Sequence, residues 1–230
     1  MREIVLDTET TGLDPNSGDR IVEIGAVELY NHMPTGKTYH QYINPQRDMP
    51  DGAFAVHGLS AEFLSGKPLF KDIAQAFLDF VGDSKMVIHN AAFDMKFINA
   101  ELKWVERPEL PWVQALDTLA IARKKFPGAQ NSLDALCRRF SITTERELHG
   151  ALLDSEILAE VYLELIGGRQ PDFALSIVSD NHATDGGSGA SWSPPPRPSP
   201  LPARITEAES EAHKEFVEKL GKAAVWTQYK

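Results

Sequence analysis

The stretch that decides the fold is Glu3-Ile4-Val5-Leu6-Asp7-Thr8-Glu9, near the start of the 230-residue chain. It begins as an apolar run typical of a buried strand and ends in two acids. Side chains alternate along a strand, so Asp7 and Glu9 point to the same face. Two like charges held side by side repel, and each costs desolvation free energy if partly buried. The pair therefore either flanks a cation or lies solvated at an exposed strand end.

The segments that follow predict a mixed α/β fold. After the strand at residues 3–7 we expect strands at 20–30, 39–43, 86–88 and 116–117 and helices at 70–81, 91–102, 118–125, 132–140 and 151–166. Turn residues, among them Gly12 and Met33-Pro34, separate the first three strands and predict an antiparallel meander. Strands first, then alternating strands and helices, predict a mixed sheet of about five strands flanked by helices.

Two further acids lie where a core-facing residue is expected. Asp154 falls on the apolar face of the helix at 151–166, and Asp94 lies at the rim of the apolar face of the helix at 91–102. An acid in such a place is paired, favoured by the helix dipole, or bound to a metal. Together with the two strand acids they make four acids on one strand and two helices.

His149 precedes Asp154 by five residues, a rotation of about 140° on a straight helix. The two would not share a helix face, so we expect His149 in the turn beside Gly150, from where its ring can swing toward the acid. An imidazole has an ordinary pKa near 6.5 and can accept a proton at cellular pH. A lone histidine is usually a surface residue or one whose ring is hydrogen-bonded for structural reasons. His149 becomes a candidate functional residue only because it lies near Asp154.

These residues fall in three motifs that resemble those of the DEDDh exonuclease family. The motifs are Asp7-Thr8-Glu9-Thr10-Thr11-Gly12-Leu13, His89-Asn90-Ala91-Ala92-Phe93-Asp94 and His149-Gly150-Ala151-Leu152-Leu153-Asp154. The resemblance covers residues 1–168 and implies a ribonuclease-H-like exonuclease domain there, which agrees with the meander-then-alternating pattern. It also implies that the protein hydrolyses a DNA 3′ end and releases 5′-mononucleotides.

The same resemblance implies that four acids bind two divalent metal ions: Asp7, Glu9, Asp94 and Asp154. We expect Asp7 to bridge both ions, Glu9 and Asp154 to bind the first, and Asp94 to support the second, with His149 as the general base. Hard carboxylate ligands suit Mg²⁺ or Mn²⁺ rather than zinc. Two cations roughly 3.5–4 Å apart can hold the attacking and leaving oxygens in line.

Five residues are candidate substrate contacts: Thr8, Thr10, His57, Asn90 and Phe93. Thr8 and Thr10 would offer backbone N–H donors beside the metals, or would only make the hydrogen bonds of a turn. His57 would contact the terminal nucleotide, or only belong to the turn before a helix cap at Ser60. Asn90 and Phe93 would line the base pocket, although Phe93 also suits a core. Stacking on an aromatic ring tolerates any base, as a proofreading enzyme requires.

The composition sets limits on partners and location. Lys and Arg number 23 against 33 Asp and Glu, a net charge of −10, whereas a protein that binds nucleic acid by phosphate contacts alone is usually basic. Either nucleic acid is not the ligand, or metal ions and a partner supply the positive charge. The single cysteine, Cys137, indicates a reducing compartment, and we find neither a signal peptide nor the roughly 20-residue apolar run of a membrane span. We expect a cytoplasmic protein with no membrane contact.

Beyond residue 168 the character of the chain changes. Residues 169–176 contain Gln170, Phe173 and Leu175 at the spacing of a sliding-clamp-binding motif, or form the last packed segment of the domain. Residues 177–205, rich in Gly, Ser and Pro, are expected to form a flexible linker. In the tail at 206–230, the capping-box spacing of Thr206 and Glu209 predicts a helix. The anchors by which this tail would dock on a polymerase catalytic subunit are Phe216, Leu220, Trp226 and Tyr229.

Three functions follow from these features. The first is a proofreading exonuclease held in a replicase by its tail, the second an RNA 3′-trimming exonuclease, and the third a non-catalytic adaptor between clamp and polymerase. The complete set of acids and histidine favours an enzyme over an adaptor. The long linker and docking helix argue against the compact RNA-trimming enzymes. A membrane-bound helix at the tail is disfavoured because five glutamates occupy its polar side.

Overall fold

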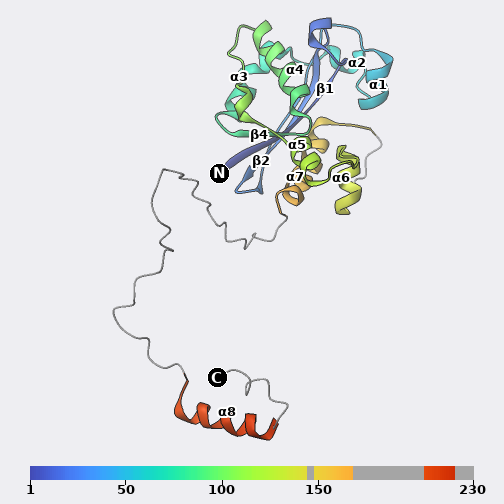
Figure 1. The fold of residues 1–230 in the computed structure, drawn as a ribbon. Helices are drawn as coiled ribbons and strands as arrows, with labels where there is room; N and C mark the ends of the chain where they lie inside the picture. The colour runs from blue at the N-terminus through green and yellow to red at the C-terminus, as the bar shows by residue number, and fades with distance from the viewer. Residues whose placement is uncertain (144–147, 168–204, 221–230) are drawn as a thin grey trace, which may run out of the picture. The chain divides into compact units, whose positions relative to one another are not determined.

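The structure is a computed structural model, and it describes residues 1–143, 148–167 and 205–220. The chain divides into two units, Met1–Leu175 and Ser176–Lys230, and Figure 1 shows the first as helices packed around a sheet. The clamp-binding segment at 169–176 lies outside the described residues, as does the linker at 177–205 except for its last residue. Their boundaries therefore stay predictions.

A five-stranded sheet in the order β3-β2-β1-β4-β5 forms the centre of the first unit. The strands are β1 (Arg2–Thr10), β2 (Ile21–Tyr30), β3 (Met33–Tyr42), β4 (Lys85–Ile88) and β5 (Ala115–Asp117). The first three pair in antiparallel fashion, β4 pairs in parallel with β1, and β5 in parallel with β4. The predicted fold class, an antiparallel meander followed by parallel strands, is confirmed.

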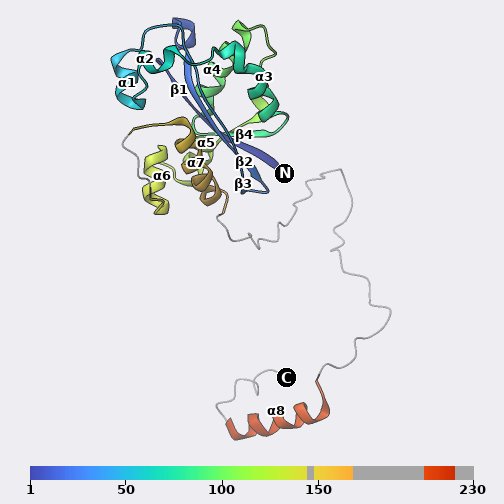
Figure 2. The same cartoon turned by 180° about the vertical axis from the view of Figure 1, so that it is seen from behind.

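Helices cover both faces of this sheet, as Figures 1 and 2 show. They are α1 (Asp51–His57), α2 (Ala61–Ser65), α3 (Phe70–Val81), α4 (Ala91–Trp104), α5 (Thr118–Lys125), α6 (Leu133–Phe140) and α7 (Ala151–Leu165), with short 3₁₀ turns at Pro15–Ser17 and Trp112–Gln114. Ile4 and Leu6 of β1 pack with α3 and α4, whereas Val5 packs with α7. Because side chains alternate along β1, Asp7 and Glu9 lie on the same face of the sheet as Val5, the face that α7 covers.

The turn between β2 and β3 differs from the prediction. The sequence predicts a turn at Met33-Pro34 and a strand from Tyr39, but β3 already begins at Met33. The turn lies at Asn31 and His32, whose φ angles are 49° and 65°, as a two-residue hairpin loop requires. Pro34 is tolerated in β3 because this strand is at the edge of the sheet. Helix α1 is also absent from the sequence-based assignment.

The described part of the second unit contains α8 (Glu207–Leu220). The predicted capping box is present: Thr206 N donates to Glu209 Oε2 (2.8 Å), and Glu209 N donates to Thr206 Oγ1 (3.3 Å). Phe216 and Leu220 are exposed on this helix, while the other two predicted anchors, Trp226 and Tyr229, lie outside the described residues. None of the helices described in either unit combines the length and apolar character of a membrane span.

Candidate active site

A cleft of about 250 Å³ lies at the carboxyl ends of β1 and β4. This edge of an open α/β sheet is where ligands usually bind, because strand ends and helix starts meet there. The residues that line it include the four predicted metal ligands and the predicted base: Asp7, Glu9, Asp94, Asp154 and His149. The chain thus brings together residues that lie up to 147 positions apart in the sequence.

Gly25 controls how closely α7 approaches β1. Gly25 pairs with Asp7 across the β1–β2 ladder, and a Cβ on it would lie 2.1 Å from the carbonyl carbon of Ala151. The Ser155 hydroxyl strengthens this approach, since its Oγ lies 2.9 Å from the Gly25 carbonyl oxygen. The same first turn of α7 carries Asp154, which is only 3% exposed. A glycine in the strand therefore sets the spacing between Asp7 and Asp154.

Asp94, in the first turn of α4, occupies an environment that disfavours its charge. Its side chain is buried, and burial raises its pKa to about 7, although the hydrogen bond donated by Thr8 Oγ1 (2.7 Å) acts to lower it. The negative charge of Asp117 raises the pKa further. A nearby cation would remove this cost, because it favours the ionised carboxylate. A buried carboxyl group with a raised pKa, in a cleft with other acids, is a candidate functional group.

His149 is held in the turn before α7, as predicted. Its Nδ1 lies 3.0 Å from Asp154 Oδ2. On its other side the backbone N–H of His149 donates to the carbonyl oxygen of Val56 (3.1 Å) at the end of α1. Next to this contact Leu148 packs over Gly58, where a Cβ would lie 2.6 Å from the leucine Cδ1. The end of α1, a helix that the sequence did not predict, thus fixes the turn that carries the histidine.

The predicted substrate contacts divide into two groups. Thr8, Asn90 and Phe93 line the cleft. Thr10 and His57 are not among its lining residues: Thr10 Oγ1 donates to the Gly12 carbonyl (2.6 Å), and the His57 Nδ1 accepts the Leu59 N–H (3.0 Å). Burial lowers the pKa of His57, so its imidazole favours the neutral form.

Asp117, at the end of β5, orients the start of α4. Its Oδ1 accepts hydrogen bonds from the backbone N–H groups of Asn90 (3.0 Å) and Leu119 (3.0 Å). Asn90 has a left-handed backbone with φ of 68°, and the carboxylate holds it in that conformation. Neither Asp117 nor Gly25 was expected from the sequence to act at the site. The signals were an acid at a helix N-cap and a glycine inside an apolar strand.

A metal ion fits this arrangement of ligands. Glu9, His149 and Asp154 each present one ligand atom, and these atoms lie within 4.8 Å of one another. Asp7 and Asp94 add carboxylate oxygens to the same cleft. Oxygen-rich sites of this kind suit hard divalent cations, and a cation would also favour the ionised form of the buried Asp94.

Comparison with known proteins identifies the family. The exonuclease family matches residues 4–162 of the chain, and the chain belongs to it. Within that family it is 49% identical, over 97% of its length and 99% of the relative's, to the DNA polymerase III subunit epsilon of Rickettsia felis. Among solved structures it resembles exonuclease X in complex with 5′-overhanging duplex DNA, with 27% identity, a TM-score of 0.57 and coverage of 71% of this chain and 90% of that one.

A more distant structure supports the fold alone. The nuclease domain of 3′hExo, a DEDDh family member bound to rAMP, superposes with a TM-score of 0.63 at 18% identity, covering 72% of this chain and 91% of that chain. The chain is therefore an enzyme, an exonuclease with the ribonuclease-H-like fold, and its predicted membership of an exonuclease family is confirmed. The comparisons favour neither the RNA-trimming enzyme nor the adaptor.

Proposed function

We propose that the protein is a metal-dependent 3′–5′ exonuclease that removes the 3′-terminal nucleotide of DNA as the proofreading subunit of DNA polymerase III. The observation that carries this proposal is the convergence of four carboxylates and His149 on one cleft at the carboxyl ends of parallel strands. The relationship to epsilon subunits over nearly the whole chain supports DNA as the substrate.

In this proposal Asp7, Glu9, Asp94 and Asp154 would hold two Mg²⁺ or Mn²⁺ ions. Such ions offset the charge of the scissile phosphate and align the attacking and leaving oxygens. His149 would take a proton from the attacking water as the water oxygen bonds to phosphorus and the bond between phosphorus and O3′ breaks. The O3′ stays on the shortened strand and takes up a proton from solvent. Asp154 keeps the imidazole in place through the contact at Nδ1, so the ring is oriented before the substrate arrives.

The terminal nucleotide would be held by the remaining cleft residues. Asn90 and Phe93 line the cleft beside Asp94, so we assign them to the base and sugar of the terminal nucleotide. Thr8 contributes through its hydrogen bond to Asp94. Thr10 and His57 would contribute through the turns that they stabilise beside the cleft.

Two segments would tether this enzyme to its replicase. In α8, Phe216 and Leu220 are exposed large apolar side chains, and with Trp226 and Tyr229 they would dock on the catalytic (alpha) subunit. Gln170, Phe173 and Leu175 would bind the sliding clamp (beta). Tethering raises the effective concentration of the exonuclease at the primer terminus, which compensates for the weak intrinsic DNA affinity of an acidic chain.

The decisive experiment is digestion of matched 3′-labelled single-stranded DNA and RNA by the purified chain, with Mg²⁺ and with chelator. We expect metal-dependent release of mononucleotides, faster from DNA, and no release by Asp154→Ala that retains its fold. Preference for RNA would overturn the DNA assignment, and normal hydrolysis by Asp154→Ala would overturn the metal site. Deletion of residues 205–230 should leave this activity intact and abolish co-purification with the alpha subunit.

A further inference from the structure

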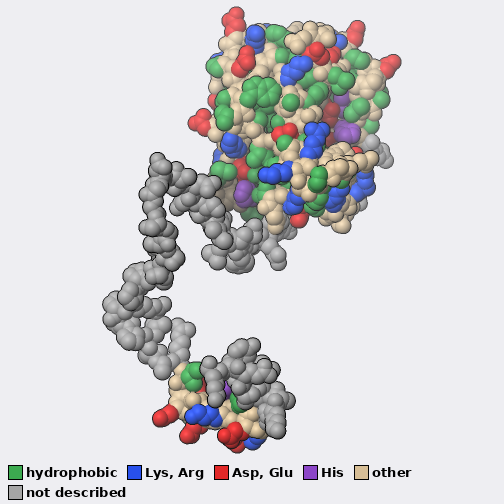
Figure 3. All heavy atoms as spheres, in the orientation of Figure 1, with side chains coloured by type: hydrophobic (Ala, Val, Ile, Leu, Met, Phe, Trp, Pro, Cys, Tyr) green, Lys and Arg blue, Asp and Glu red, His purple; other side chains and the backbone are tan. Residues whose placement is uncertain are grey.

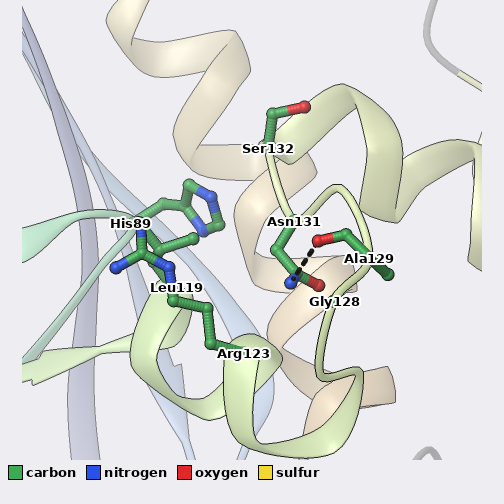
Figure 4. A pocket seen from close by; sticks show the side chains of 7 residues that line it. All are labelled: His89, Leu119, Arg123, Gly128, Ala129, Asn131 and Ser132. Atoms are coloured by element: carbon green, nitrogen blue, oxygen red, sulfur yellow. Dashed lines mark hydrogen bonds between the residues drawn. The ribbon is translucent and has the colours of Figure 1, made fainter.

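A second hollow adjoins the acidic cleft. Its volume is about 570 Å³, within the range of sites that bind nucleotide-sized ligands. His89 and Ser132 line both hollows, so the two are neighbours. Figure 4 shows how α5 contributes Leu119 and Arg123 to one wall, while the loop at 128–132 forms the opposite wall.

Arg123 gives this hollow a positive charge. In Figure 4 its side chain extends from α5 toward His89. The two groups interact, because the guanidinium charge adds to burial in lowering the pKa of His89. In the part of the chain that the structure describes, Arg123 forms no ion pair and its side chain makes no hydrogen bond. No described carboxylate therefore pairs with it directly, although the charge of Asp117 also acts on His89 and raises the pKa of that histidine.

The surroundings of Arg123 depart from the acidic character of the chain. The chain has a net charge of −10, yet Lys124, Arg138 and Arg139 lie exposed on α5 and α6, the two helices that flank the loop at 128–132. Figure 3 shows Lys and Arg side chains gathered on this face of the first unit. Asp134 of α6 lines the acidic cleft but not the second hollow. Carboxylates thus line the first cleft, whereas the residues that line the second hollow include Arg123 and no carboxylate.

The loop wall is built before any ligand binds. Asn131 is buried, and its side-chain amide donates to the carbonyl oxygens of Ala129 (2.9 Å) and Phe126 (3.3 Å). The guanidinium of Arg139 stacks on Phe126, 4.3 Å from the ring centroid. These contacts fix the loop, and a rigid wall lowers the entropy cost of holding a ligand.

We propose that this hollow binds a backbone phosphate of the single strand whose 3′ end occupies the acidic cleft, with Arg123 as the cation. The inference rests on the proposed exonuclease function. A nucleic-acid strand carries one phosphate for each nucleotide, and the scissile one lies among the carboxylates. The next phosphate toward the 5′ side must pass over a neighbouring surface, and the hollow beside His89 offers a guanidinium with no ion-pair partner among the described residues, the group best suited to phosphate.

The test compares Arg123→Gln with Arg107→Gln. Arg107 is also an exposed arginine, and it lies beyond the far end of α4, roughly 20 Å of helix away from Asn90 at 1.5 Å per residue. Each protein is assayed on a thymidine dinucleotide, which has one phosphodiester, and on a longer oligothymidylate. We expect Arg123→Gln to raise the KM for the oligomer about tenfold more than for the dinucleotide, because one charged hydrogen-bonded contact is lost. Arg107→Gln should raise neither.

Equilibrium binding separates this inference from the proposed function. Binding of a fluorescent oligothymidylate in chelator needs no hydrolysis, and the slope of log affinity against log salt should fall by about 0.7 in Arg123→Gln, the value for one phosphate of a single strand. Arg123→Lys should recover part of the affinity. An unchanged slope, or an equal loss on dinucleotide and oligomer, would overturn the inference. If thymidine 5′-monophosphate binds more weakly to Arg123→Gln as well, the hollow holds the product and not the strand, which also overturns it. If the wild-type protein binds the oligomer through Arg123 but shows no hydrolysis, only the proposed function is overturned and the inference about the hollow stands.

Discussion

His149 and Asp154 are joined by a contact of 3.0 Å between Nδ1 and Oδ2. His149 is the predicted proton acceptor and Asp154 a predicted metal ligand. Mutating each residue separately can therefore distinguish the role of the base from that of the ligand. His149→Ala should lower kcat by about 10²–10⁴-fold, the usual loss when a general base is removed. The affinity for Mn²⁺, measured by titration calorimetry, should change far less.

The control for this prediction is Asp154→Asn, which keeps the shape of the side chain and removes its charge. It should lower both Mn²⁺ affinity and kcat. Because His149 also lies within ligand distance of Glu9 and Asp154, an equal loss of metal affinity and turnover in His149→Ala would show that the histidine binds the metal.

The buried Asp94 makes the metal-free protein sensitive to pH. Its pKa is raised from 3.8 to about 7 by burial, so the folded state holds this proton more tightly than the unfolded chain. Stability therefore falls as pH rises from about 4 to about 7, the interval in which only the unfolded chain ionises. Asp94→Asn carries no charge at any pH, and its oxygen can still accept the hydrogen bond from Thr8.

The measurement is urea unfolding of the wild type and Asp94→Asn in chelator across that pH interval. Near pH 4 the two free energies of unfolding should agree, and toward pH 7 Asp94→Asn should become the more stable protein. Added Mn²⁺ should stabilise the wild type and have less effect on the variant. A constant difference between the two proteins across the interval would contradict the prediction.

Much of the fold and site could be predicted because the relevant signals are local. Alternation along residues 3–9 puts Asp7 and Glu9 on one face, and helical spacing puts Asp154 on a buried face. The β2–β3 turn was misplaced because Met33-Pro34 has the composition of a turn, whereas the positive φ angles fall on Asn31 and His32. The role of Gly25 depends on a helix more than 120 residues later in the chain, which no local pattern reveals.

The contact between α1 and the His149 turn should matter for catalysis. Gly58 has φ of 71°, and a Cβ there would lie 2.6 Å from Leu148 Cδ1. Gly58→Ala should therefore crowd Leu148 and strain the left-handed end of α1, which holds the His149 N–H through Val56, lowering kcat while Mn²⁺ affinity is kept. In the double variant Gly58→Ala/Leu148→Ala the clash is gone, so kcat should recover in part.

Single-turnover rates measured for both variants test this arrangement, because they report the chemical step without product release. If Gly58→Ala lowers the free energy of unfolding but leaves the single-turnover rate unchanged, the contact serves the fold and does not position the histidine.

The backbone of α7 approaches Gly25 so closely that even a substitution by alanine should strongly affect the protein. In Gly25→Ala the new methyl group would meet the backbone of Ala151 at 2.1 Å, and backbone cannot move aside as a side-chain tip can. The first turn of α7 must shift away from β2, at a cost of about 1–3 kcal/mol in unfolding free energy. Asp154 moves with that turn, so Mn²⁺ affinity and exonuclease activity should fall together.

Gly52→Ala is the matched control, since it adds the same methyl group in α1 with no atom within 4 Å and no positive φ. Replacing a helical glycine by alanine should leave activity unchanged and stabilise the fold by up to about 1 kcal/mol. Thermal unfolding and Mn²⁺ titration of both variants decide the matter. A Gly25→Ala protein with wild-type metal affinity would show that α7 tolerates displacement from the strand, and that the spacing of Asp7 and Asp154 is set elsewhere.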